Sequence, residues 1–391
     1  MIQFKERILQ RVDSLKERIF EISDDIFHNP ELGNEEFRSS KILADELAKN
    51  GFEVSIPIGS QKTAFKAVKR GKSKKPIIAF LAEYDALPGV GHGCGHNWIG
   101  TASTFAGIVV AECIGELYGQ IQVFGTPAEE NFGGKIILLE EGFFDDADIA
   151  MMVHPSNETK IYYRSLAANV IEVEFKGKAA HAAASPWLGV NALDALIQSF
   201  VAIDNLKKQL NPAFRIPGII KYGGDRANIV PDHAIGAFSL RTETLAEMDV
   251  LKEKVANIFK GASLATGCSF TMVDTERVYA PMITNKILGK IFEKNFLELG
   301  GKIIKNPLKG VGSVDIGNLS QKFPCIHPSV SVVDDFNLPG HSVEFGLASI
   351  SEKGKSELIR TIKTLALTAL EIFLNPSVID EMKEELKNTP K

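Results

Sequence analysis

Cysteine is scarce in this sequence: Cys94, Cys113, Cys268 and Cys325 are the only four in 391 residues. Their spacing is not that of a disulfide framework, and the N-terminus opens as a charged amphipathic helix instead of a signal peptide. Both absences favour a reducing compartment, and we predict a cytoplasmic protein.

The sequence also lacks a strong charge of one sign and a long hydrophobic run. A formal net charge of -5 and the absence of a clustered Lys and Arg face argue against nucleic acid as a partner. The most apolar helix expected, from Ile99 to Ile114, is short for a membrane span and carries several hydroxyl side chains and Glu112. We therefore expect a buried helix and no association with a membrane.

The length of the chain predicts more than one domain. A chain of 391 residues exceeds what one hydrophobic core usually serves, and an apolar content of 45% is enough to build two. We expect a discontinuous first domain, residues 1–167 and 282–391, and an inserted second domain, residues 168–281.

Three segments of the first domain share one pattern, a continuous apolar run followed at once by charged or liganding side chains. The runs are Ile77–Leu81, Ile121–Phe124 and Ile149–Val153. Strands that are apolar on both faces are typical of a parallel sheet covered by helices on each side. The sequence thus predicts an α/β domain with a mostly parallel sheet and helices on both faces.

The side chains that follow these runs are acids or metal ligands by type. In parallel sheets, ligands bind beyond the carboxyl ends of the strands. The predicted sheet would bring to one edge Asp85, Cys94, His96, Glu129, Glu130 and His154. Motifs that are far apart in the sequence would then form one site.

The segment Gly91–Asn97 places His92, Cys94 and His96 close together, separated by glycines. Thiolate and imidazole together suit zinc or a similar transition metal. A glycine-rich turn with an isolated histidine and a packed cysteine would look much the same. This segment alone leaves the two interpretations open.

The two ends of the chain predict helices of the first domain. Apolar residues from Phe4 to Ile22 recur at helical spacing and predict one amphipathic helix. A long helix with an apolar stripe is expected through Leu358 and Phe373, and the polar tail from Asp380 is expected to fray.

From about Ala168 the pattern changes, because apolar and charged residues alternate from Ile171 to Lys176. Such alternation predicts a strand with one buried and one wet face. The expected order that follows is helix, strand, strand, helix and strand, which is the ferredoxin-like arrangement. We therefore predict an inserted ferredoxin-like α+β domain.

Six motifs in order resemble a known family. They are Glu83–Pro88, Gly91–Asn97, Pro127–Glu130, Val153–Pro155, Gly177–Ala182 and Pro339–Ser342. Together they resemble the amidohydrolase branch of the aminoacylase and carboxypeptidase superfamily of dinuclear metallopeptidases. This branch includes aminobenzoyl-glutamate hydrolase, N-acyl-amino-acid deacylases and a dipeptidase-like member. The resemblance implies a metal-dependent amidohydrolase with an inserted lid and dimerisation domain.

For the metal centre, the resemblance implies two divalent cations per chain, zinc or manganese, with cobalt as a further candidate. The implied ligands are Cys94, His96, Glu130, His154 and His341. Glu129 would be the general base, and Asp85 would orient a liganding histidine. Two adjacent glutamates on a loop cannot easily point the same way, so one can bind metal while its neighbour faces the attacking water. A bound cation would lower the pKa of that water to roughly 7.

In the inserted domain, the resemblance implies that His181 polarises the scissile carbonyl, in several relatives from the partner subunit. Asn228 and Arg241 resemble substrate-contacting positions, although an arginine on the wet face of a strand is equally ordinary. This domain also implies a homodimer or a higher homo-oligomer. Asn97 replaces the aspartate of many members, which shifts the expected substrate toward dipeptides or aminoacyl conjugates.

The expected activity is hydrolysis of an amide bond in a dipeptide or an N-acyl amino acid, a small-molecule substrate. Two other functions stay open: a thiol acyl hydrolase with Cys94 activated by His92 or His96, or binding of a metal or small molecule without catalysis. The first leaves Glu129 without a role, and the presence of that base argues against the second. The roles of His92 and Glu83 stay open.

Overall fold

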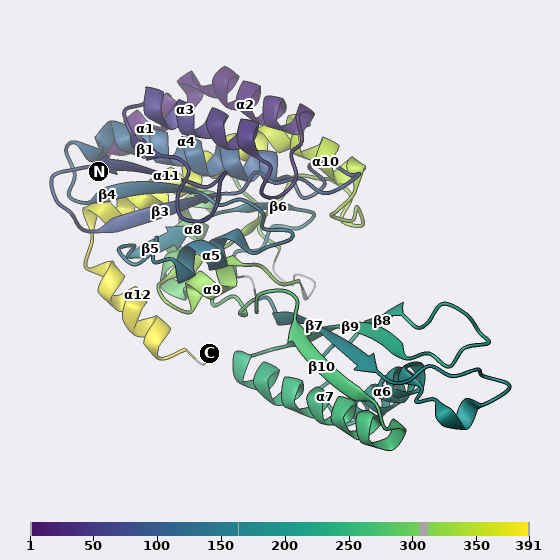
Figure 1. Cartoon of the computed structure of the whole chain (residues 1–391). Coiled ribbons are helices and arrows are strands. Elements are labelled where there is room, and N and C mark those ends of the chain that lie inside the picture. Colours follow the sequence, from purple (N-terminus) through teal and green to yellow (C-terminus); the bar gives the residue numbers. More distant parts are fainter. Residues whose placement is uncertain (1, 163, 305–311, 390–391) are drawn as a thin grey trace. The chain divides into compact units, whose positions relative to one another are not determined.

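The computed structural model describes residues 2–162, 164–304 and 312–389. It divides the chain into two compact units, each with a hydrophobic core of its own (Figure 1). Unit 1 is formed by the described residues within 1–164, 282–310 and 314–390. Unit 2 is formed by those within 165–281 and 311–313. Most of unit 2 is therefore one segment inserted into the sequence of unit 1.

Unit 1 is built around a six-stranded sheet in the order β1-β2-β4-β3-β5-β11. Its strands are β1 (Glu53–Ser55), β2 (Phe65–Arg70), β3 (Ile77–Ala82), β4 (Gln120–Gly125), β5 (Ile149–Met151) and β11 (Cys325–Ile326). The last four are parallel to one another, whereas β1 and β2 add an antiparallel edge. A separate parallel pair consists of β6 (His154–Ser156) and β12 (Ser329–Ser331).

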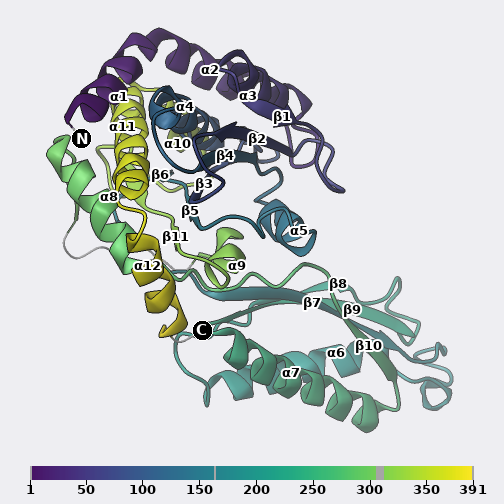
Figure 2. The same ribbon diagram turned by 90° about the vertical axis from the view of Figure 1, so that its left-hand side faces the viewer.

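The three apolar runs of the sequence form the central strands, which confirms the predicted fold class. β3, β4 and β5 are buried along their whole length, because helices cover the sheet. Helix α4 (His96–Ile114) packs on β3 and β4, and α11 (Glu352–Leu374) packs on α4. In both views these two helices lie on one side of the sheet, and α5 (Gly134–Glu140) and α9 (Ile316–Ser320) lie on the other (Figures 1 and 2).

Helix α4 is the buried helix expected near residues 99–114. By length and composition it could cross a membrane, but 89% of its apolar window is buried inside unit 1. Its polar side chains have partners: Trp98 Nε1–H donates to the carbonyl oxygen of Gly354 at 3.0 Å, and the Ser103 hydroxyl donates to that of Leu81. The helix is therefore a core element, and its first residue lies beside the site described below.

The N-terminal prediction of a single helix is wrong. The remaining helices of unit 1 are α1 (Ile2–Ser14), α2 (Lys16–His28), α3 (Phe37–Lys49), α8 (Lys286–Glu298), α10 (Val343–Ser349) and α12 (Val378–Lys387). α1 and α2 are separated at Leu15, which has φ -101° and ψ 2°. The break lets buried residues on both helices, such as Val12 and Ile22, reach the same core.

The prediction of a fraying tail is also wrong, because residues from Val378 onward form α12. Ile379, Met382 and Leu386 recur at helical spacing and are all buried. Three apolar side chains in an otherwise charged segment are enough to dock this helix on unit 1.

Unit 2 is a four-stranded antiparallel sheet in the order β10-β7-β9-β8. Its elements in chain order are β7 (Ala167–Lys176), the short 3-10 helix η1 (Pro186–Leu188), α6 (Ala192–Lys207), β8 (Gly218–Tyr222), β9 (His233–Thr242), α7 (Leu245–Thr266) and β10 (Ser269–Asp274). Helices α6 and α7 pack against each other and the sheet, and Phe175 of β7 contacts Phe259 of α7. The predicted ferredoxin-like arrangement is confirmed.

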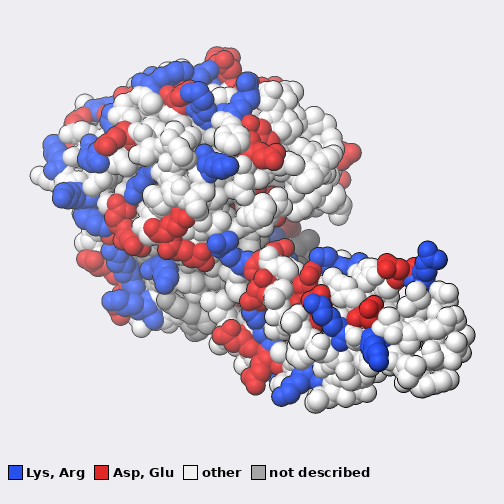
Figure 3. Space-filling view, viewed as in Figure 1, with Lys and Arg blue, Asp and Glu red and all other residues white. Residues whose placement is uncertain are grey.

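Charged side chains of both signs are interspersed over the face of the molecule shown in Figure 3. Many pair with the opposite charge, such as Lys75 with Asp148 at 3.0 Å and Lys294 with Glu371 at 2.9 Å. Among the described residues on this face, the two signs balance locally, without a continuous field of either.

Candidate metal centre and active site

The carboxyl ends of the parallel strands β3, β4 and β5 meet at one edge of the sheet of unit 1. Glu83 and Asp85 follow β3, Glu129 and Glu130 follow β4, and His154 follows β5. The structure thus brings together side chains that the sequence places in separate motifs, at the edge where α/β sheets bind ligands.

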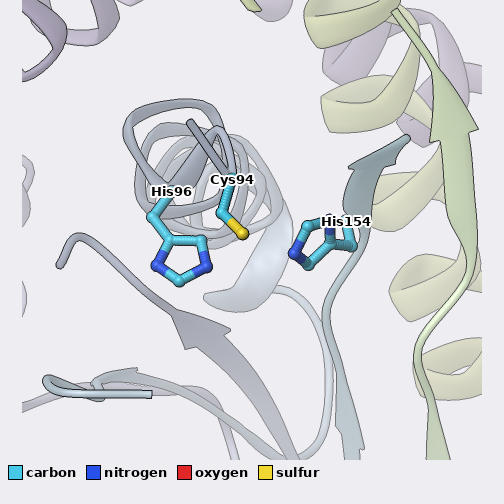
Figure 4. A group of neighbouring side chains, drawn as sticks. All are labelled: Cys94, His96 and His154. Carbon is cyan, nitrogen blue, oxygen red and sulfur yellow. The ribbon is translucent and has the colours of Figure 1, made fainter. Parts of the chain in front are cut away.

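Cys94, His96 and His154 form the first group of candidate ligands. Their ligand atoms lie within 4.8 Å of one another, and the three side chains point toward a common space (Figure 4). His96 is the first residue of α4, and the preceding Gly95 has φ 75°. A Cβ atom at Gly95 would lie 2.6 Å from Cγ of Pro155, so only glycine lets this helix start so close to β6.

Cys94, Glu130 and His341 form a second group, again with ligand atoms within 4.8 Å of one another. His341 comes from the loop before α10. Its backbone N–H donates to the carbonyl oxygen of Gly93 at 3.0 Å, and its Nε2 lies 3.8 Å from Oε1 of Glu130. One thiol therefore belongs to both groups, as a ligand shared by two cations would.

The loop after β4 directs Glu129 and Glu130. Ala128 adopts φ 57°, and its N–H donates to Oε1 of the buried Glu36 at 2.8 Å. The carboxylates of Glu129 and Glu130 both lie within 4.8 Å of a His96 nitrogen, and Glu130 also belongs to the group with His341. Glu129 is thus next to the candidate cation sites without belonging to either of the groups that share the thiol.

Asp85 contacts two of the candidate ligands. Its Oδ1 accepts a hydrogen bond from His96 Nδ1 at 2.8 Å, and its Oδ2 accepts one from the Glu130 backbone N–H at 3.1 Å. In a neutral His96 ring, this arrangement leaves the lone pair on Nε2, the nitrogen that faces the group. Asp85 therefore orients both a histidine and the glutamate loop, as expected for the acid behind a metal-binding histidine.

Several polar atoms at this edge have no hydrogen-bond partner among the described residues. They are His96 Nε2, Glu130 Oε1 and Glu83 Oε2, and all three are buried. Buried polar atoms normally find partners, because leaving them unsatisfied costs free energy. A bound cation would satisfy a nitrogen and two carboxylate oxygens at once, so these residues fit a metal ion.

Burial and neighbouring charges shift the protonation of the site. Burial raises the pKa of Cys94 to about 12, with a contribution from Glu130. Burial opposes protonation of His96, but the Asp85 carboxylate outweighs it and raises the pKa of His96 well above its ordinary value. Burial and the nearby carboxylates of Glu83, Asp315 and Glu130 raise the pKa of Glu129 well above its ordinary value.

Two residues beside the site, Lys135 and Asp315, were missed by sequence reasoning. Lys135 is fully buried, and its ammonium donates to Glu83 Oε1 at 2.5 Å and to Asp315 Oδ1 at 2.8 Å. Burial alone would raise the pKa of Glu83, but Lys135 and the nearby histidines hold it at about 2. The one sequence signal was a lysine within the apolar run of α5, where a charge is unexpected.

The three predicted residues of the inserted domain all belong to unit 2 and are absent from the ligand groups of unit 1. His181 is exposed, and its Nδ1 accepts hydrogen bonds from the backbone N–H groups of Ala183 and Ala184. Asn228 is exposed as well. Arg241 donates to the hydroxyl of Ser313.

Two relatives match nearly the whole chain. The Xaa-Arg dipeptidase of Mus musculus is 35% identical over 403 residues, which covers 98% of this chain and 92% of the relative. A p-aminobenzoyl-glutamate hydrolase polypeptide of Escherichia coli (strain K12) is 29% identical and covers 96% of this chain and 93% of its own length.

Solved structures share the fold at low sequence identity. An aminobenzoyl-glutamate utilization protein from Klebsiella pneumoniae matches 93% of this chain and 97% of its own, with a TM-score of 0.73 and 18% identity. A dinuclear metal binding peptidase of the M20 family from Bacillus subtilis matches 92% and 99%, with a TM-score of 0.69 and 18% identity. Residues 166–266 match the family model described as a peptidase dimerisation domain.

Proposed function

This chain belongs to the M20 peptidase family, and on that premise we propose that it hydrolyses the amide bond of a dipeptide or N-acyl amino acid with the help of two divalent cations. The observation that carries the proposal is the sharing of Cys94 between two groups of candidate ligands. A hydrolase of this family needs a site that activates water, and the edge of the sheet in unit 1 offers one.

The proposed ligands are Cys94, His96 and His154 for one cation and Cys94, Glu130 and His341 for the other. Thiolate and imidazole favour zinc, and manganese or cobalt would also accept the carboxylate. When bound, the cations would polarise the scissile carbonyl and lower the pKa of the attacking water.

Glu129 is the proposed general base. Its carboxylate lies within 4.8 Å of ligand atoms of His96 and Glu130, so it is next to the place where water would attack. Burial and neighbouring acids raise the pKa of Glu129, which favours the form that has taken a proton from water. The same carboxyl can then return that proton to the leaving amine.

His181 of unit 2 is the proposed donor to the carbonyl oxygen. Because its Nδ1 accepts hydrogen bonds from two backbone N–H groups, the proton of the neutral ring resides on Nε2. That exposed N–H is a donor of the kind that stabilises a developing oxyanion. Asn228 and Arg241 are proposed to contact the rest of the substrate.

Unit 2 is also the proposed dimerisation domain, with a second copy of the chain as its partner. β8 is an edge strand of its sheet, and Ile219 and Ile220 on this strand are 63% and 48% exposed. Helix α6 exposes Ile197 and Val201. Light scattering should give twice the chain mass, and a fully active monomer would remove any role of His181 in a partner's site.

The thiol hydrolase alternative is less well supported by this site. A nucleophilic cysteine needs a lowered pKa, whereas burial raises that of Cys94 to about 12. All four cysteines are free thiols in the structure, which is in keeping with the proposed cytoplasmic location.

A pool of dipeptides and N-acyl amino acids, followed by mass spectrometry, would test the activity. Because one relative is named an Xaa-Arg dipeptidase, dipeptides ending in arginine or lysine belong in the pool. We expect cleavage that a chelator abolishes and added zinc or manganese restores. Cleavage that persists in chelator would contradict the use of metal.

The neighbouring glutamates give a matched test of the base. Glu129→Gln should reduce turnover at least about 100-fold while both cations stay bound, since general bases contribute roughly 10² to 10⁴. Glu130→Gln should instead lose metal. Near-normal turnover of the Glu129→Gln enzyme would refute the assignment of the base.

A further inference from the structure

Lys135 is a buried cation that the proposed reaction does not use. Its side chain has no exposed surface, and its ammonium lies between Glu83 and Asp315. The backbone N–H of Lys135 also donates to Oδ2 of Asp315, at 3.0 Å. Asp315 therefore holds the lysine at two points, and the lysine in turn fixes one oxygen of Glu83.

The other oxygen of Glu83 faces His96. Glu83 is 2% exposed and His96 is fully buried. Glu83 Oε2 lies 3.5 Å from His96 Nε2, and neither atom has a hydrogen-bond partner among the described residues. Since His96 Nδ1–H donates to Asp85, the neutral ring presents a lone pair to Glu83. Two buried acceptors that face each other lack a donor or a cation between them.

The separation of these two atoms fits a shared cation. Ligand atoms at about 2.1 Å from a metal ion and at a tetrahedral angle to each other are about 3.4 Å apart. The observed 3.5 Å between Glu83 Oε2 and His96 Nε2 agrees with that spacing. Fixing Glu83 through Lys135 would keep this oxygen in place before a cation binds.

We propose that Glu83 is an additional ligand of the cation bound by His96, and that Lys135 and Asp315 are positioning residues that hold its carboxylate. This inference rests on the metal use put forward above. It makes the two sites unequal, with four protein ligands around one cation and three around the other. The site with three, formed by Cys94, Glu130 and His341, keeps a position open for water or substrate.

Two isosteric variants test the proposal, because Glu83→Gln and Asp315→Asn each remove one carboxylate from Lys135. Metal content per chain and affinity for zinc are measured by elemental analysis and by competition with a chelator. We expect two cations in the wild-type protein and in Asp315→Asn. In Glu83→Gln, one of the two cations should bind at least 10-fold more weakly.

Equal affinities in Glu83→Gln and Asp315→Asn would overturn the proposal, because Glu83 would then be only a counter-ion of Lys135. If Glu83→Gln does not fold, Glu83→Asp decides the question, since it keeps a negative charge for Lys135 but withdraws the carboxylate. Weaker binding of one cation supports the proposal, and wild-type affinity for both overturns it. Wild-type protein that binds no cation would instead refute the proposed function, and this inference with it.

Discussion

Replacing Glu36 by glutamine should make unit 1 more stable at alkaline pH. Glu36 is fully buried beneath the loop that carries Glu129 and Glu130. Its Oε1 accepts the N–H of Ala128 and its Oε2 accepts the hydroxyl of Thr63, both at 2.8 Å. A glutamine fits the same contacts, because its oxygen can accept from Ala128 and its amide can donate to the Thr63 hydroxyl.

The expected magnitude follows from the pKa of Glu36. Burial, with the nearby Asp85 carboxylate, raises this pKa from 4.5 to about 7. Between these values the folded state binds more protons than the unfolded state, so the stability of the wild type falls as pH rises through that window. At 1.36 kcal/mol per pH unit, the loss is about 3 kcal/mol. Glu36→Gln does not titrate and avoids it.

Urea unfolding of the chelator-treated protein at pH 5 and pH 8 would measure the effect. The only tryptophans are Trp98, buried in unit 1, and Trp187, 77% exposed in unit 2, so fluorescence in a Trp187→Phe background reports on unit 1. The stability of Glu36→Gln relative to the wild type should rise by about 2 to 3 kcal/mol between the two pH values.

The control for this experiment is Glu6→Gln, which removes an exposed carboxylate and should follow the wild-type profile. Thr63→Val removes a hydrogen bond that lowers the pKa of Glu36, and should therefore steepen the pH dependence. A difference between Glu36→Gln and the wild type that stays constant from pH 5 to pH 8 would refute the reasoning.

Two further substitutions probe the site in unit 1. Asp85→Asn removes the charge that orients His96, and should weaken metal affinity about 10- to 100-fold in a chelator competition; wild-type affinity would show that His96 needs no such support. Gly95→Ala places a Cβ atom 2.6 Å from Pro155 Cγ at a residue with φ 75°, and should cost at least about 1 kcal/mol, seen as a lower midpoint in calorimetry; an unchanged midpoint would show that β6 can yield.

Much of the fold could be predicted from the sequence because its signals are local. The apolar runs of β3, β4 and β5 and the alternation along β7 specify strands with two or one buried faces, whatever surrounds them. The predictions failed where packing decides. The break at Leu15 and the docking of α12 through Met382 depend on where the core lies, which periodicity alone does not reveal.

The candidate ligands were predicted by residue type and motif, and the parallel register of the strands brings most of them to one edge. His341 is different, because its place depends on a backbone hydrogen bond to Gly93 across a long stretch of chain. The sequence by itself therefore determined the donor set and the fold class. Only the tertiary structure decided that Cys94 is common to two groups and that Lys135 holds Glu83, because both depend on contacts between segments far apart in the chain.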